Sequence, residues 1–412
     1  MKYKLALRTL TRRLLFILAI LGPGLITASA DNDASGIATY SLVGSHYGYR
    51  MLWVVVAVTI GEVVVAEMGA RMGAVTGKGT ADLIRENFSL RLTLFAMLCL
   101  VIANLGTTVG QFAGIAAGGE MLGISRYITV PIAALLLAGL VILGSYFYVE
   151  KFLLALSLFS LCYVASAIMA KPDWGEVLRD SLLPHVEMAP MYILTILATV
   201  GTTITPWGIC YVQSSVADKG VKMSEYKYTR LDVAFGAAWG NVVSAFIIIA
   251  TAATLFSAGI RVESAEQAAL ALEPLMGAGT TTLFAVGLLG ASLLAGSVLP
   301  LATAYSLCEA FGWERGLNNR LKEAPVYYGI FAGAILVSCL IILIPGIPLF
   351  PVMWLSQTLN AIFLPVLLVL VLKLINDKHL MGEMVNSKLQ NTLAIFLTVV
   401  ISAVTILLLV VS

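Results

Sequence analysis

The stretch GPGLITASADNDASGIATYS, residues 22–41, places polar residues in the middle of an otherwise apolar part of the chain. Asp31, Asn32 and Asp33 lie near its centre and are followed by small residues that form helix poorly. Charge inside a membrane span is costly and by default marks function. We therefore predict two half-helices joined by an unwound segment, where free carbonyls and a carboxylate can meet a cation. An extracellular loop between two short helices is the alternative, but the run leading into Asp31 is too short for a second crossing.

The composition around this stretch is that of a membrane protein. Hydrophobic residues make up 59% of the 412 residues and charged residues 12%, against about 25% charged residues in average soluble proteins. So few charges cannot coat a globule of this size, which excludes soluble enzymes, disordered tails and fibrous proteins. The net charge of +2 gives no reason to expect a nucleic-acid partner, because the basic residues are scattered. The lipid bilayer is the expected surrounding, and no protein partner can be inferred.

Apolar runs between charged or Pro/Gly-rich breaks predict eleven spans, each near or above the roughly 20 residues that cross a bilayer. The spans lie at about 14–47, 51–75, 92–119, 127–148, 150–170, 190–216, 231–258, 277–311, 326–345, 348–374 and 392–412. A cytoplasmic N-terminus places most of the 25 Lys and Arg residues inside, as the positive-inside rule requires. We expect a single transport domain over residues 1–412, in the inner membrane of a prokaryote, with the C-terminus outside.

A second interruption lies in the span at 190–216, within ATVGTTITPWGICYVQSS. Pro206 and Gly208 break this span, and a plain kink stabilised by neighbouring groups is the simpler interpretation. The position favours a functional break, because the two interruptions are five spans apart, at corresponding places in two five-helix halves. Such a pair of broken helices indicates a midplane substrate site in an inverted-repeat transporter. The repeats would cover about 14–170 and 190–374, with an extra helix at 392–412.

Other polar residues in the spans have less certain roles. Gln357 and Asn360 share one helical face and need polar partners or a wet cavity, and helix–helix hydrogen bonding is the alternative. Glu67 and Arg71, four residues apart, predict a structural or gating ion pair near the cytoplasmic end, with metal binding as the alternative. Glu62 could line the pathway or form a pair.

Several motifs resemble those of the Nramp (natural resistance-associated macrophage protein) divalent-metal transporters. GPGLITASADNDASGIATY resembles the family's first helix, where GPG precedes an Asp-Pro-Gly-Asn motif; in that register Asp33 falls on the motif Asp. EMGARMGAVTGKGTADLIRENF is similar to the second helix and following loop, and SQTLNAIFLP to the tenth. TTITPWGICYVQSS aligns with the sixth-helix Met-Pro-His motif through Pro206. The resemblance implies an all-α, LeuT-like fold of 5+5 helices with helices 1 and 6 broken, plus an eleventh helix.

The departures from the family pattern concern the ion. The motif Met, a soft thioether, falls on Thr205, and the motif Asn falls on Gly36, which leaves more room and one ligand fewer. Carboxylate, carbonyl, hydroxyl and water ligands suit magnesium, which usually keeps several of its waters. The pattern therefore resembles the Nramp-related magnesium transporter branch.

Further departures concern proton coupling. The family's sixth-helix His falls on Trp207, and its proton-relaying acid of the third helix falls on Gln111. A proton wire then has few titratable steps. The membrane potential alone favours entry of a divalent cation by about 4.6 kcal/mol per 100 mV, which is sufficient for uniport. Asp31 stands against this view, because it adds a carboxylate where the family pattern is not acidic.

We therefore expect a transporter, not an enzyme, that imports largely hydrated Mg²⁺ by alternating access without protons or a cofactor. The resemblance implies metal ligands at Asp33, at the carbonyls of Ala30 and Thr202, and at the oxygens of Thr205, Gln357 and Asn360. The residues expected to line the cavity are Asn32, Gly36, Trp207 and Gly208.

The sequence is compatible with three other functions. A proton-coupled Mn²⁺ or Fe²⁺ importer is the mainstream activity of the family, and Mn²⁺ would then be the substrate. An organic-substrate symporter of the same fold would cradle a substrate carboxylate at half-helix N-termini, which the adjacent Asp31 and Asp33 oppose. An intramembrane metalloenzyme needs several fixed ligands and a water-activating base, and the sequence has no HExxH or paired-His spacing.

Overall fold

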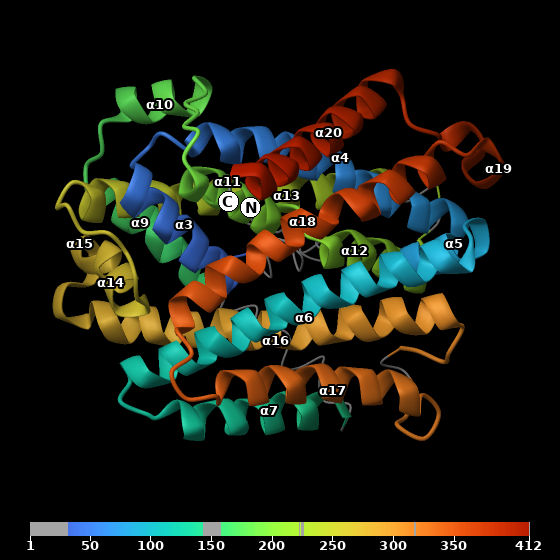
Figure 1. The fold of residues 1–412 in the computed structure, drawn as a ribbon, viewed down its shortest axis with the longest axis horizontal. Coiled ribbons are helices and arrows are strands. Elements are labelled where there is room, and N and C mark those ends of the chain that lie inside the picture. Colours follow the sequence, from blue (N-terminus) through green and yellow to red (C-terminus); the bar gives the residue numbers. More distant parts are fainter. Residues whose placement is uncertain (1–31, 143–157, 222, 224–225, 317–318, 412) are drawn as a thin grey trace, which may run out of the picture.

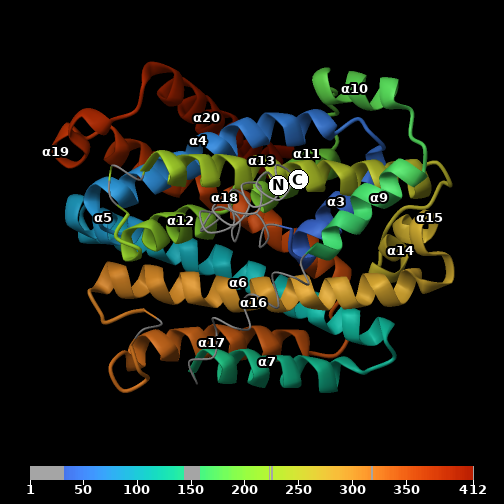
Figure 2. The same ribbon diagram turned by 180° about the vertical axis from the view of Figure 1, so that it is seen from behind.

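The structure, a computed structural model, describes residues 32–142, 158–221, 223, 226–316 and 319–411. Every regular element in these ranges is helical. Most of the long helices run across the bundle in Figure 1, and the view from behind in Figure 2 shows the same arrangement. The short helices α10, α14 and α15 lie at one end, and α5 and α19 lie at the other. Their bounds are Trp174–Leu182, Ala265–Ala269, Glu273–Met276, Thr80–Asn87 and Lys378–Met381.

Within the described ranges, eight helical segments are long and apolar enough to cross a membrane. They are α4 (Leu52–Thr76), α6 (Leu90–Met121), α11 with α12 (Pro190–Thr203 and Pro206–Asp218), α13 with the π-helical η2 (Tyr226–Thr251 and Ala252–Phe256), α16 (Thr280–Phe311), α17 (Pro325–Ile342), α18 (Leu349–Ile375) and α20 (Lys388–Val411). These segments match eight of the predicted spans to within a few residues, except that α13 begins five residues earlier than predicted. The chain is thus an integral membrane protein.

The other three predicted spans are described only in part. Helix α3 (Ala34–Tyr47) forms the second half of the first span. Helix α7 (Arg126–Ile142) belongs to the fourth span, and η1 with α9 (Leu158–Ser160 and Leu161–Met169) belongs to the fifth. The remainder of each lies outside the described residues, as do Ala30 and Asp31.

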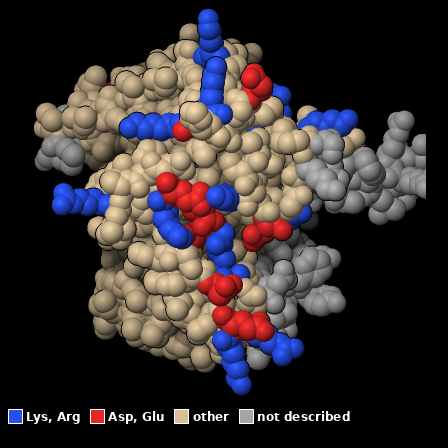
Figure 3. All heavy atoms as spheres, turned by 90° about the vertical axis from the view of Figure 1, so that its right-hand side faces the viewer, with Lys and Arg blue, Asp and Glu red and all other residues tan. Residues whose placement is uncertain are grey.

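We call the end that carries α5 and α19 the inner end, because its loops are those predicted to face the cytoplasm. The opposite end, with α10, α14 and α15, is the outer end. Figure 3 looks at the inner end and shows Lys and Arg side chains gathered there together with Asp and Glu. Since charges are excluded from lipid, this face is expected to lie in water.

Small residues bring the start of α3 directly against α6. A Cβ atom on Gly110 would overlap Ser35 Oγ, and one on Gly114 would overlap the Cβ atom of Ala34. Small residues at such positions let membrane helices approach closely. The first turn of α3, and with it Asp33, is therefore held on the surface of α6, which also packs against α16 and α18.

A second close approach joins α11 to α18 and yields a prediction. A Cβ atom on Gly201 would collide with the backbone carbonyl of Gln357, with the Ala361 nitrogen 2.7 Å away. We expect Gly201→Ala to lower the free energy of unfolding by about 1–3 kcal/mol, because a backbone carbonyl inside a helix cannot move aside. Thermal and denaturant unfolding in lipid nanodiscs measures this change.

The matched control is Gly333→Ala in α17, where nothing lies within 4 Å of the added methyl group. That variant should be neutral or stabilising by up to about 1 kcal/mol, because alanine forms helix better than glycine. Equal effects of the two substitutions would show that α11 and α18 do not pack as described.

Candidate functional site

The predicted break in the sixth span is confirmed. Helix α11 ends at Thr203, Ile204 and Thr205 are extended (φ −107° and −98°), and α12 begins at Pro206. Proline suits the first position of a helix because it has no N–H to satisfy there. The Thr205 hydroxyl caps α12 by accepting a hydrogen bond from the Gly208 nitrogen at 3.2 Å.

The same proline frees a carbonyl at the break. In a continuous helix the carbonyl of Thr202 would accept from the nitrogen of residue 206, but Pro206 has no hydrogen to donate. Thr202 is buried, so this oxygen lacks its usual helical partner in a part of the bundle that is closed to bulk solvent. The break thus presents a free carbonyl at Thr202 and a hydroxyl at Thr205 within four residues of each other.

Asp33 lies at the N-terminus of α3 as its capping residue. Its Oδ1 accepts from the Gly36 nitrogen at 2.6 Å, and its Oδ2 accepts from Gln111 Nε2 of α6 at 2.5 Å. The side chain is only 4% exposed. The positive end of the helix dipole and the capping bond both favour a carboxylate at this position. Asp33 is therefore a buried acid whose direction is fixed by two helices.

Gln111 has a more direct role than its sequence suggests. Besides holding Asp33, its Nε2 lies 3.2 Å from Ser35 Oγ, and its Oε1 accepts from the Ala34 nitrogen at 3.3 Å. From the sequence, Gln111 was expected only to stand where the family has a proton-relaying acid. The signal that could have indicated the contact is the polar face of α6, where Gln111 follows Asn104, Thr107 and Thr108.

The two amides of α18 have different surroundings. Asn360 Nδ2 donates to Gln357 Oε1 at 2.8 Å and to the Gly201 carbonyl at 3.2 Å, while Asn360 Oδ1 accepts from Thr107 Oγ1 at 3.1 Å. Asn360 therefore ties α18 to α11 and α6, as the hydrogen-bonding alternative proposed. Gln357 Nε2 is buried, and it has no hydrogen-bond partner among the described residues. A buried polar group of this kind indicates a position that meets water or a ligand.

The residues predicted to line the cavity are distributed around the break. Gly36 is buried in the first turn of α3. Asn32 donates to the Gly240 carbonyl of α13 and accepts from Ser244 Oγ, both at 3.2 Å. Gly208 lines a small cavity beside the break. Trp207 lies instead in an apolar cluster with α16 side chains, where its ring is 1% exposed.

Two small cavities flank the break. One of ≈ 20 Å³ is lined by Glu62, Thr203, Thr205 and Gly208 among others. The second, of ≈ 10 Å³, is also lined by Glu62 and Thr203 and extends toward α13. The first cavity is also lined by the apolar residues Val65, Ala66, Ile204, Ile209 and Val212, and a cavity of either size has room for about one water molecule. The break is thus a place where water or a small ion fits.

The outer end of the molecule is hollow. A cavity of ≈ 520 Å³ opens there, lined by residues of α3, α6, α11 and α18 and by the segment 262–266. Its charged lining residues include Glu120, Glu263, Glu266 and Arg126, and Arg126 pairs with Glu120 at 2.6 Å. An acidic mouth of this kind raises the local concentration of cations.

The inner end is held together by a buried carboxylate. Glu309 of α16, 1% exposed, accepts from Ser214 Oγ of α12 at 2.7 Å and lies 3.6 Å from Arg315 Nε. Arg315 also pairs with Asp82 of α5 at 2.6 Å. Burial raises the pKa of the Asp82 carboxyl above its ordinary value, and Arg315 opposes that shift. These contacts join the half-helix α12 to its neighbours below the break.

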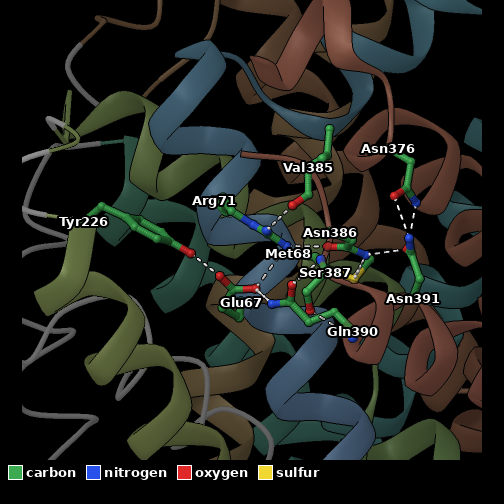
Figure 4. Close-up of polar contacts among 10 residues, drawn as sticks. All are labelled: Glu67, Met68, Arg71, Tyr226, Asn376, Val385, Asn386, Ser387, Gln390 and Asn391. Carbon is green, nitrogen blue, oxygen red and sulfur yellow. Dashed lines mark hydrogen bonds and ion pairs between the residues drawn. The ribbon is translucent and has the colours of Figure 1, made fainter. Parts of the chain in front are cut away.

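The predicted ion pair of α4 is also confirmed at the inner end (Figure 4). Arg71 and Glu67 are both buried and lie 3.3 Å apart. Arg71 donates to Asn386, Gln390 donates to Glu67 at 3.0 Å, and Tyr226 donates to the other Glu67 oxygen. The pair therefore ties α4 to the start of α13 and to the segment that leads into α20.

Within the described ranges, no group of three or more His, Cys, Asp or Glu side chains is placed to hold a metal ion. A cation beside Asp33 would therefore be held by one carboxylate with carbonyl, hydroxyl, amide and water oxygens. Such hard oxygen ligands suit Mg²⁺, Ca²⁺ and Mn²⁺.

Comparison with known proteins extends these observations. Residues 24–411 match the family model described as natural resistance-associated macrophage protein-like, or Nramp. The chain is 28% identical over 397 residues to the divalent metal cation transporter MntH of Erwinia tasmaniensis, which covers 93% of this chain and 92% of that protein. A manganese transporter from Eremococcus coleocola has a similar structure, with a TM-score of 0.74 at 20% identity over 96% of this chain and 86% of the other. MhsT in complex with L-phenylalanine is similar at a TM-score of 0.58 and 14% identity, over 94% of this chain and 98% of the other. These likenesses confirm the predicted LeuT-like fold class.

Proposed function

Because the chain belongs to the Nramp family, we propose that it transports divalent metal ions across a membrane by alternating access. The finer proposal is that its ion is largely hydrated Mg²⁺ and that protons are not carried with it. It would work in the inner membrane of a prokaryote, with the N-terminus in the cytoplasm, the C-terminus outside, and repeats at about 14–170 and 190–374.

The observation that carries the choice of ion is the chemistry at Thr205. Its hydroxyl lies at the helix break, three residues after the carbonyl that Pro206 frees at Thr202. A thioether at this position would favour softer transition metals, whereas hydroxyl and carbonyl oxygens favour a hard cation. Magnesium keeps several of its waters and needs only one or two carboxylates. Asp33, the one carboxylate of the proposed ligand set, fits this requirement.

The proposed ligand set keeps five of the six ligands expected from the sequence and gives the sixth, Asn360, an orienting role. Asp33 would bind the ion, in part through water, with the carbonyls of Ala30 and Thr202 and the hydroxyl of Thr205. Gln357 Oε1, which accepts from Asn360, would be the atom that contacts the ion, and the Nε2 donor without a described partner would bond to an oxygen such as a water of the ion's shell. Asn360 would act by orienting Gln357, because its own amide group is already engaged.

Gln111 supports transport without protons. The partner of Asp33 on α6 is an amide, which donates a hydrogen bond but cannot take up a proton at ordinary pH. The outer cavity and the tied inner end suggest that the described conformation accepts ions from outside. Release inward would require the contacts of Glu309 and Arg315 with α12 and α5 to open.

Proton-coupled Mn²⁺ uptake is the second candidate function. The names of the relatives favour it, because one is a divalent metal cation transporter and another a manganese transporter. Mn²⁺ also accepts oxygen ligands.

Uptake by proteoliposomes under a fixed membrane potential distinguishes the two. The vesicles contain a magnesium-sensitive dye and a pH dye, and Mg²⁺, Mn²⁺ and Ca²⁺ are supplied alone and in competition. An inside-negative potential should drive Mg²⁺ entry at constant internal pH, and empty vesicles provide the baseline. Mn²⁺ entry with internal acidification and without Mg²⁺ entry would replace the proposal by the second candidate.

A further inference from the structure

Glu62 is a buried carboxylate in the middle of a membrane-spanning helix that the proposed ligand set does not use. It follows Leu52, the first residue of α4, by ten residues, which is about 15 Å along the helix axis. Asp33 precedes the outer end of α3 by fourteen residues, or about 21 Å. Both carboxylates therefore lie well inside the membrane-spanning part of the fold, one on α4 and the other at the start of α3. Ionisable groups at such depths mark ion or substrate pathways by default.

The orientation of Glu62 is fixed by α13. Asn241 Nδ2 donates to Glu62 Oε2 and to the Ala237 carbonyl one turn earlier, the latter at 2.9 Å. The Glu62 side chain is 8% exposed. A carboxylate held in this way is preorganised, so little of its side-chain freedom remains to be lost when it binds a ligand.

Both small cavities beside the break have Glu62 in their walls. The first also contains Thr203, Thr205 and Gly208, and so reaches the interruption itself. The second contains Tyr40 and Thr203, as well as the α13 side chains Asn241 and Ser244.

Hydroxyl and amide groups supply most of the other polar atoms around Glu62. Tyr40 and Thr203 hydrogen-bond to each other at 2.9 Å, and Ser244 bonds to Asn32, the residue before Asp33, at 3.2 Å. Two polar residues of α13, three positions apart, therefore link the two places: Asn241 bonds to Glu62, and Ser244 bonds to the neighbour of Asp33. Oxygen donors of these kinds are the ligands that hard divalent cations select.

We propose that Glu62 forms a second cation position, on the α4 and α13 side of the break, which a divalent cation that has lost most of its waters can occupy next to the Asp33 site. Its ligands are the Glu62 carboxylate, the hydroxyls of Thr203 and Thr205, and about one retained water, because the two cavities have room for roughly one small species each. The inference rests on the proposed function, because it assumes that divalent cations enter the break.

Mn²⁺ binding to the purified full chain, followed by electron paramagnetic resonance, tests this position directly. Asp33→Ala should still bind Mn²⁺, because Glu62 remains. The double variant Asp33→Ala with Glu62→Gln should bind Mn²⁺ at least about tenfold more weakly than Asp33→Ala, equivalent to about 1.4 kcal/mol. Excess Mg²⁺ should displace the ion bound to Asp33→Ala.

Two further variants separate ion binding from structural damage. Glu62→Asp in the Asp33→Ala background keeps the charge and should retain Mn²⁺ binding. Glu86→Gln removes an exposed carboxylate of α5 that pairs with Lys78, and in the same background it should leave binding unchanged. Unfolding measurements on each variant establish that it is folded.

The inference is overturned if Asp33→Ala binds no Mn²⁺, or if adding Glu62→Gln leaves its affinity unchanged. Failure of the proposed function gives a different result, since the parent protein would then admit no divalent cation into proteoliposomes, whatever Glu62 binds.

Discussion

Replacement of Asp33 by alanine is expected to reduce divalent-cation uptake to about a hundredth of the parent rate or less. Removing one partner of a buried charge pair typically costs about 3–5 kcal/mol, and about 2.7 kcal/mol already corresponds to a hundredfold change. Asp33 is the described carboxylate that α3 and α6 hold in place together. Initial rates of Mg²⁺ entry into proteoliposomes, at a fixed membrane potential, measure the loss.

Asp33 also caps α3, so the loss of charge must be separated from the loss of the cap. Asp33→Asn keeps a side-chain oxygen for the Gly36 nitrogen, and asparagine caps helices about as well as aspartate. We expect Asp33→Asn to fold like the parent and still to transport poorly. Asp173→Asn makes the same substitution at the cap of α10, at the outer end, and should leave uptake unchanged. Parent-like uptake by Asp33→Asn would show that the cap, and not the charge, is what transport requires.

The substitution Gln111→Glu is expected to make metal binding depend much more steeply on pH. It would place a second carboxylate at the position where Gln111 Nε2 now lies 2.5 Å from Asp33 Oδ2. Two carboxylates in contact share a proton, because both cannot ionise at that distance. A cation must then displace this proton, so the variant's affinity should rise with pH by up to about tenfold per unit.

The pH dependence is measured as the Mg²⁺ affinity of parent and variant between about pH 6 and 8, with internal pH recorded during uptake. The parent should show the shallower dependence. Gln267→Glu adds the same charge in the outer segment around α14, where Gln267 caps the Glu263 nitrogen, and should keep the parent's slope. If the metal affinity of Gln111→Glu also depends on pH with the parent's slope, the contact between Gln111 and Asp33 does not control proton release.

The membrane spans follow from local sequence, and their bounds are close to those of the structure. The span predicted at 92–119 is α6, Leu90–Met121, and that at 348–374 is α18, Leu349–Ile375. Long apolar runs leave the backbone no option in lipid other than a helix. The break at Pro206 was predictable for an equally local reason, since proline removes one hydrogen bond of the helix wherever it occurs.

Contacts within one helix could also be predicted, whereas the partners of single polar residues on other helices could not. The pair of Glu67 and Arg71 follows from a spacing of four residues on α4. The sequence pattern likewise gave Gln357 and Asn360 a common face, but not the contacts of Asn360 with Gly201 and Thr107. Those contacts depend on how three helices pack.

By itself, the sequence determined that this protein is a helical membrane protein with an interrupted sixth span and an acidic residue in its first. Each of these features is set by neighbours within a few residues, through hydropathy, proline chemistry and helical spacing. Only the tertiary structure decided that Gln111 holds Asp33, that Asn241 orients Glu62, and that Trp207 packs against α16. Asp33 and Gln111, 78 positions apart, meet because small side chains let α3 approach α6, and Glu62 and Asn241, 179 positions apart, meet where α4 packs against α13. Hydropathy cannot specify such partners, because lipid accommodates any apolar helix face equally well.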